Sequence, residues 1–173
     1  MWNEQIIMML LEGIKDTLYM TLTSTLIGYV IGLPMGILLT VTDKDGIHPN
    51  AAVYKVLDVI ANLIRSVPFL ILLIVLIPFT RFLIGRSYGP TATIVPLVIA
   101  AAPYIARMVE SSLKEVDAGV IEAARSMGAS NFTIVTKVML VEARTSLIVG
   151  ATISLGTILG YSAMAGTVGG GGA

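Results

Sequence analysis

The chain of 173 residues is 55% hydrophobic and has a mean hydropathy of +0.89, which is more apolar than a soluble domain needs to fill its core. Eleven basic and eleven acidic residues give a formal net charge of zero, so no overall field attracts nucleic acid, and we expect no nucleic-acid partner. The sequence has no cysteine, which excludes disulfides and thiolate metal sites but leaves the compartment undecided.

Four apolar segments are long enough, at about 20 residues each, to cross a bilayer as helices. Residues 17–42, 87–106 and 145–173 carry no charge, and residues 59–80 are interrupted only by Arg65. Pro90, Pro96 and Pro103 predict kinks in the third segment, and the glycine run at residues 169–172 predicts a flexible outward-facing loop. The predicted fold is an all-α polytopic membrane protein, with residues 1–173 forming a single transmembrane domain.

The first segment carries glycine at every fourth position. Gly28, Gly32 and Gly36 lie on one face of the predicted helix, which permits close contact with another helix. We expect this contact to be packing within one protomer rather than a seam between two copies. The N-terminus carries acids where a signal peptide is basic, and no small-residue cleavage site follows, so this segment should be retained.

The second segment contains the only charged residue within the four, Arg65. A charged residue at membrane depth is a candidate for function, and Pro68 predicts a bend just after it. Arg65, Ser66 and Pro68 are therefore candidate gating or pathway residues. Because Arg65 is expected near the inner end of the segment, anchoring by extension to the cytoplasmic interface is an equal alternative.

The connection after the third segment has the densest basic charge in the chain: Arg107, Lys114, Arg125, Lys137 and Arg144. Since cytoplasmic connections are enriched in Lys and Arg, this connection should face the cytoplasm. Alternation then places the connection with Lys44 and Lys55 inside, and the N-terminus outside.

A helix, a glycine turn and a second helix are predicted within this connection, at residues 115–141. Asp117 can cap the first helix, Gly128 can end it in a left-handed conformation, and Ser130 or Asn131 can cap the second. The apolar positions of the first helix share one face: Val116, Val120, Ile121, Ala124 and Met127. The helix could lie on the inner leaflet, but small residues beside one acid suit a protein contact better.

The sequence "EAARSMG" at residues 122–128 resembles the EAA loop of permease subunits of bacterial ATP-binding-cassette importers. The family pattern continues to a proline, where this chain has Val141. Further likeness to the methionine-type branch lies in "RSVPFLILLIVLIPFTR" (65–81), "IVPLVIAAAPYIARMVESSL" (94–113) and "YSAMAGTVGGGG" (161–172). That branch usually has five spans, and this sequence stops before the fifth, so either the natural chain is longer or this is an incomplete protomer.

The resemblance implies a permease domain in the bacterial inner membrane that pairs with a second copy, so that the pathway runs between the protomers. It also implies an extracytoplasmic binding protein that delivers a small amino acid, methionine. The loop would act as a coupling helix docked on a cytoplasmic ATPase dimer. Its docking residues would be Glu122, Ala123, Ala124, Arg125, Gly128, Ala129 and Ser130.

The sequence contains no G-x-x-x-x-G-K-[ST] phosphate loop, so ATP and magnesium are expected on the partner and no cofactor on this chain. No intramembrane enzyme is predicted, because the apolar segments offer no paired aspartates, no Ser with His and no H-E-x-x-H motif. No metal site is predicted either, because Glu110, Glu115 and Asp117 fall on different helix faces. Two alternatives remain open: an ATPase-independent transporter or channel, and a truncated permease without activity.

Overall fold

The computed structural model describes residues 3–171, and every regular element in this range is a helix. The elements are α1 (Glu4–Thr42), α2 (Ala51–Ser66), α3 (Phe69–Val75), α4 (Ile77–Ile84), α5 (Pro90–Lys114), α6 (Ala118–Ser126), α7 (Asn131–Thr133), the π-helix η1 (Ile134–Met139), α8 (Leu140–Glu142) and α9 (Arg144–Gly166). The last two residues of the predicted fourth span, 172–173, and residues 1–2 of the predicted domain lie outside the described range.

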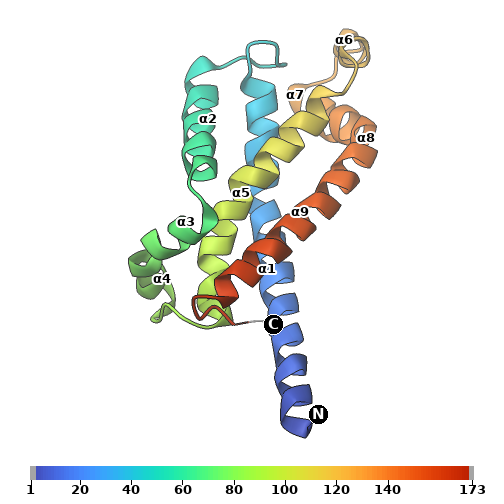
Figure 1. Ribbon diagram of the computed structural model, residues 1–173. Coiled ribbons are helices and arrows are strands. Elements are labelled where there is room, and N and C mark those ends of the chain that lie inside the picture. The colour runs from blue at the N-terminus through green and yellow to red at the C-terminus, as the bar shows by residue number, and fades with distance from the viewer. Residues whose placement is uncertain (1–2, 172–173) are drawn as a thin grey trace.

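The predicted all-α membrane fold is confirmed. Helices α1, α5 and α9 are each long and apolar enough to cross a membrane, and α2 with α3 makes a fourth span if this bent pair is counted as one. Figure 1 shows the chain passing from one end of the bundle to the other through α2, α3 and α4 before α5 returns. The loops at 43–50 and 115–143 therefore share one end of the bundle, as the distribution of Lys and Arg predicts.

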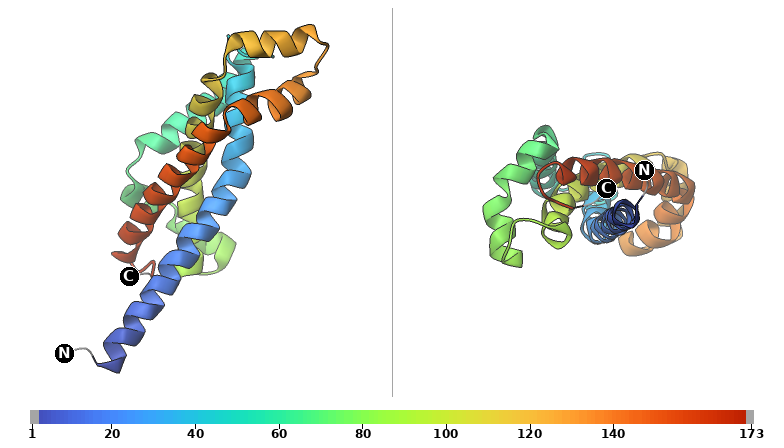
Figure 2. Two further views of the ribbon diagram at one scale, coloured as in Figure 1. Left: turned by 90° about the vertical axis from the view of Figure 1, so that its right-hand side faces the viewer. Right: turned by 60° about the horizontal axis from the view of Figure 1, so that its bottom comes forward.

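Helix α1 is longer than the uncharged segment that predicted it. It begins at Glu4 rather than at residue 17. The Asn3 side chain caps this start by accepting a hydrogen bond from the Ile6 amide. Its 39 residues extend about 58 Å, so the first turns project beyond the other helices (Figure 2). The search for uncharged residues placed the start of this helix too late, because the first turns lie outside the bundle and can therefore carry charged residues.

Helix α5 also continues past its predicted end at residue 106. Arg107 and Lys114, assigned to the connection from their charge, lie on the helix instead. Both cations are paired, Arg107 with Asp58 and Glu110, and Lys114 with Asp43 at 2.7 Å, so their charge does not end the helix. The helix also continues through Pro96 and Pro103 without a break.

The glycine stripe of α1 faces α5. A Cβ atom at Gly32 would lie 2.7 Å from the Ala102 carbonyl oxygen, and one at Gly36 would lie 2.6 Å from that of Ala106. At Gly28 the Ile105 side chain would be 3.0 Å away. Only hydrogen fits at such distances, so the stripe lets the two longest helices cross in close contact within the protomer.

A sharp bend separates α2 from α3, at an angle of 102°. Val67, before Pro68, has an extended backbone with φ −86° and ψ 124°, because a following proline disfavours the helical conformation. The proline ring also lacks the N–H that would continue the α2 hydrogen bonds.

The glycine turn after α9 packs against the beginning of α5. The Gly89 amide donates a 3.0 Å hydrogen bond to the Gly169 carbonyl oxygen, and the Thr93 hydroxyl donates one of 3.2 Å to that of Gly170. The carbonyl oxygens of Gly169 and Gly170 thus find donors at the start of α5, so this part of the predicted flexible loop is packed against the bundle.

A candidate docking loop at one end of the bundle

Residues 115–141, hereafter the docking loop, form a helical hairpin with local caps. The Asp117 carboxylate accepts a 2.8 Å hydrogen bond from the Gly119 amide at the start of α6, and the Ser130 hydroxyl accepts one of 3.2 Å from the Thr133 amide at the start of α7. Gly128 joins the two halves with φ +83°, a conformation that side chains with a branched Cβ resist. The second half then runs through a π-helical segment, η1, which the sequence did not indicate.

The inner face of the docking loop belongs to the core of the bundle. Ala124 of α6 and Ile134 and Met139 of η1 are buried in one cluster with Val109 and Leu113 of α5. Figure 2 shows α6 lying across the end of the bundle, beside the return segment. Because interiors of this kind are close-packed, displacement of the loop would be transmitted to α5.

The predicted docking residues divide between two faces. Glu122, Ala123, Arg125, Gly128 and Ser130 are exposed. Ala129 is half-buried, and Ala124 is only 6% exposed because it faces the bundle core. The available surface is therefore one side of α6 and the turn after it.

Two large apolar side chains on this surface were missed. Met127 is 83% exposed and Phe132 is 77% exposed, on either side of the Gly128 turn. The helical period places Met127 on one apolar face with Ala124, but Met127 is the C-cap residue of α6 and does not share the burial of Ala124. Exposed apolar side chains at a polar end of a molecule mark a contact surface.

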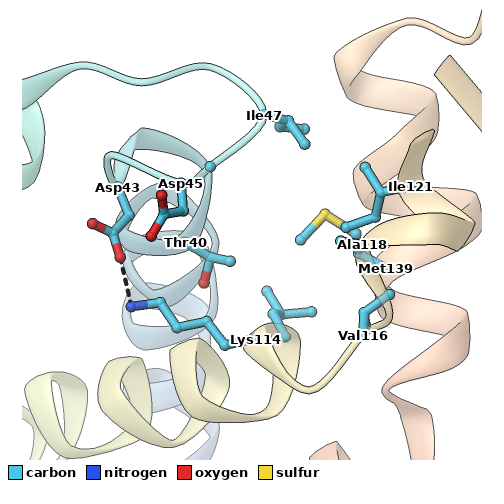
Figure 3. A pocket seen from close by; sticks show the side chains of 11 residues that line it. Thr40, Asp43, Asp45, Ile47, Lys114, Val116, Ala118, Ile121 and Met139 are labelled. Atoms are coloured by element: carbon cyan, nitrogen blue, oxygen red, sulfur yellow. Dashed lines mark ion pairs between the residues drawn. The ribbon is translucent and has the colours of Figure 1, made fainter.

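Arg125 connects the docking loop to the loop between α1 and α2. Its guanidinium donates a 3.0 Å hydrogen bond to the Ile47 carbonyl oxygen. Between these two loops lies a cavity of about 340 Å³, with Ile47 on one side and Ile121 on the other (Figure 3).

The Lys114–Asp43 ion pair closes one side of this cavity (Figure 3). The hydrogen bond from Lys114 holds the pKa of the Asp43 carboxyl below its usual value. The carboxylate is therefore ionised at neutral pH, and the pair fixes the end of α1 to the end of α5.

Arg107 fixes α2 to α5 one layer deeper in the bundle. Its guanidinium pairs with Asp58, donates a 2.8 Å hydrogen bond to Asn62 Oδ1, and lies 3.3 Å from Glu110 Oε1. Its side chain is 16% exposed, and a guanidinium so enclosed needs these acceptors. The sequence indicated the charge of Arg107 but not the α2 partners.

The predicted gating residues lie at the α2–α3 bend. Arg65 and Ser66 are the last two residues of α2, and Pro68 caps α3. The expectation that Arg65 lies near the inner end is wrong, because α2 begins at Ala51, well before residue 59, and Arg65 falls where the helix ends (Figure 1). Its side chain is exposed beside a cavity of about 190 Å³.

Across residues 3–171, no three carboxylate or imidazole side chains gather closely enough to hold a metal ion. Glu110, one of the acids considered for such a site, is 9% exposed and lies 3.6 Å from Lys114 as well as beside Arg107.

The structure is thus a bundle of helices long enough to span a membrane, with a helical hairpin packed on one end. Residues 7–173 match the family described as "Binding-protein-dependent transport system inner membrane component", and the chain belongs to this family. It is a transport subunit.

Among its relatives are the D-methionine transport system permease proteins MetI of Salmonella typhimurium and Escherichia coli K12. Each is 51% identical to this chain over 164 residues, which cover 95% of this chain and 76% of the relative.

The fold is shared with solved transporters. A structure of the MetNI methionine ABC transporter, in an inward-facing conformation, matches with a TM-score of 0.96 and 51% identity, covering 99% of this chain and 79% of that one. An amino acid ABC transporter solved with histidines has a TM-score of 0.76 at 23% identity, covering 95% of this chain and 74% of that one, and shows the fold alone.

Proposed function

We propose that this chain is the permease subunit of an ATP-driven methionine importer in a bacterial inner membrane. The identity of 51% with MetI permeases supports the substrate class, since it extends over 95% of the chain. Two copies would enclose the pathway, and a binding protein on the outer side would deliver the amino acid.

The docking loop carries this proposal. It couples an exposed surface, with Glu122, Met127 and Phe132, to a buried face that is continuous with the α5 core. A partner that moves the loop would therefore move the membrane-spanning helices. We assign the exposed surface to a cytoplasmic ATPase subunit, which would bind ATP and magnesium, because these 173 residues contain no phosphate loop.

The predicted docking residues act in two ways under this assignment. Glu122 and Ala123 would contact the ATPase directly, together with the turn around Gly128, Ala129 and Ser130. Ala124 and Arg125 would hold the loop on the bundle, because one is buried and the other is hydrogen-bonded to Ile47.

The proposed orientation places the docking loop in the cytoplasm and the N-terminus outside. It is supported by the placement of the connections in Figure 1, since the loops at 43–50 and 115–143 share one end and this end carries more Lys and Arg than the loop between α4 and α5. ATP-driven motion would shift the population between inward-open and outward-open bundles.

Uptake into proteoliposomes tests this function. The chain should be reconstituted with its ATPase and binding protein, and uptake of radiolabelled D- and L-methionine measured with and without ATP. Uptake is expected only with both the ATPase and ATP. Uptake by the chain alone would contradict the proposal and favour an ATPase-independent transporter.

A further inference from the structure

Arg65 is an unpaired cation part-way along the membrane-spanning bundle. Helix α2 has 16 residues and extends about 24 Å from the docking-loop end, and Figure 1 shows that it stops about half-way along the bundle. Within residues 3–171, the Arg65 guanidinium has neither an ion-pair partner nor a hydrogen-bond acceptor, whereas Arg107 has several. A charged group at this depth is costly unless it faces a water-filled space or a ligand.

Such a space lies beside Arg65. The cavity of about 190 Å³ is formed where four helices meet: α2 contributes Arg65, α3 contributes Phe69 and Leu72, α5 contributes Tyr104, and α9 contributes Tyr161. Its volume is below the roughly 300–1,000 Å³ of pockets for drug-sized ligands, so it suits a ligand as small as an amino acid.

The cavity walls are ordered by contacts between the helices. The Phe69 and Tyr161 rings stack with centroids 4.7 Å apart and planes at 11°, and the Tyr104 and Thr157 hydroxyl groups are 3.3 Å apart. These contacts join α3 to α9 and α5 to α9. The cavity therefore offers one cationic corner and a wall in which Phe69 and Leu72 lie beside two tyrosine rings.

We propose that this cavity is a transit site for the amino acid, with the Arg65 guanidinium binding the α-carboxylate and Phe69 and Leu72 contacting the apolar side chain. A guanidinium matches a carboxylate with two parallel hydrogen bonds, which are strong away from bulk water. This assignment rests on the proposed importer function and extends it by naming the group that recognises the substrate. It also explains why a cation without a protein partner lies at this depth.

Binding to the acid and to its amide distinguishes carboxylate recognition from a structural role. The complete permease–ATPase complex should be purified without the binding protein, and its affinities for methionine and methionine amide measured by equilibrium dialysis. The wild type is expected to bind the acid about 10- to 100-fold more tightly. Arg65→Gln should abolish this preference, and Arg65→Lys should retain part of it.

Two controls isolate the effect. Arg81→Gln removes the same charge from an exposed position on α4 outside the cavity, and should leave the preference unchanged. Ala100→Leu fills the cavity from α5 and should weaken the acid and the amide by the same factor. Size-exclusion chromatography of each variant reports whether the complex remains assembled. If Arg65→Gln does not assemble, the binding preference of Arg65→Lys is the test instead.

The proposal is overturned if the wild type does not distinguish the acid from the amide, including the case in which it binds neither. It is also overturned if Arg65→Gln, or Arg65→Lys where only that variant assembles, keeps the full preference. Transport of an amino acid other than methionine would instead refute the substrate of the proposed function. The acid and amide of that amino acid would then test Arg65 in the same way.

Discussion

The Arg125 guanidinium donates a 3.0 Å hydrogen bond to the backbone carbonyl oxygen of Ile47, which joins the last turn of α6 to the loop between α1 and α2. A residue within the docking motif thus contacts its own chain. Together with the Lys114–Asp43 ion pair at 2.7 Å, it makes the two loops at this end of the bundle one unit.

Loss of the Arg125 contact should loosen the loop between α1 and α2. In Arg125→Ala, the amides of His48 and Asn50, which donate to the Val41 and Thr42 carbonyl oxygens, are expected to exchange hydrogen about two- to tenfold faster. Hydrogen exchange read by mass spectrometry measures this. Lys137→Ala, an exposed cation elsewhere in the loop, is the control, and equal exchange in both variants would show that Arg125 does not hold the two loops together.

The close approach of α1 and α5 predicts that alanine destabilises the protein at a glycine of this contact, although alanine normally favours a helix. Gly36→Ala should lower the free energy of unfolding by about 1–3 kcal/mol, because its Cβ would lie 2.6 Å from both the Ala106 carbonyl oxygen and the Val109 Cβ. Gly160→Ala on α9 has no atom within 4 Å of its Cβ and should be neutral or stabilising. Thermal unfolding in detergent compares them, and an equal loss in both would contradict the packing account.

Arg107 and Asp58 should stabilise the fold as a pair, so that the effect of removing one side chain depends on whether the other is present. Asp58→Ala leaves the enclosed Arg107 guanidinium without one of its anions, and Arg107→Ala leaves the part-exposed Asp58 carboxylate without its cation, so each should destabilise the protein. In a double-mutant cycle, the coupling between them should be about 1–3 kcal/mol, discounted toward the lower value because Asp58 is 31% exposed. A coupling near zero would mean that the contact does not hold α2 to α5.

Gly128→Val should damage coupling more than folding. A β-branched residue resists φ +83° and would cost about 1–3 kcal/mol at the turn, which lies outside the spans. ATP hydrolysis should continue with less methionine transported per ATP. Gly128→Asn, which tolerates the left-handed conformation, should be milder. Loss of folded protein with Gly128→Val would instead show that the turn is needed for the fold.

Features with local chemical causes could be predicted from the sequence. The Asp117 cap, the Gly128 turn, the Ser130 cap and the bend at Pro68 each depend on one or two neighbouring residues. The spans themselves follow from runs of apolar residues that are long relative to the bilayer.

The errors concern where helices begin, end and make contact, which spacing alone does not decide. Arg107 and Lys114 lie on α5 rather than in a connection because Asp58 and Asp43 neutralise them, and neither pairing can be read from spacing. Met127 fits one apolar face with Ala124 by period but, as the C-cap residue of α6, does not share the burial of Ala124. The position of Arg65 was misjudged because α2 begins at Ala51, before the apolar segment at residues 59–80.

The most direct test of the central claim is co-purification of this chain with its ATPase subunit in detergent. The wild type should retain the ATPase, whereas Glu122→Ala and Met127→Ser, on the exposed face of the docking loop, should weaken retention by about tenfold. Glu142→Ala, which removes an exposed carboxylate at the far end of α8, should bind as the wild type does. Equal retention by all four proteins would contradict the assignment of this surface to the ATPase.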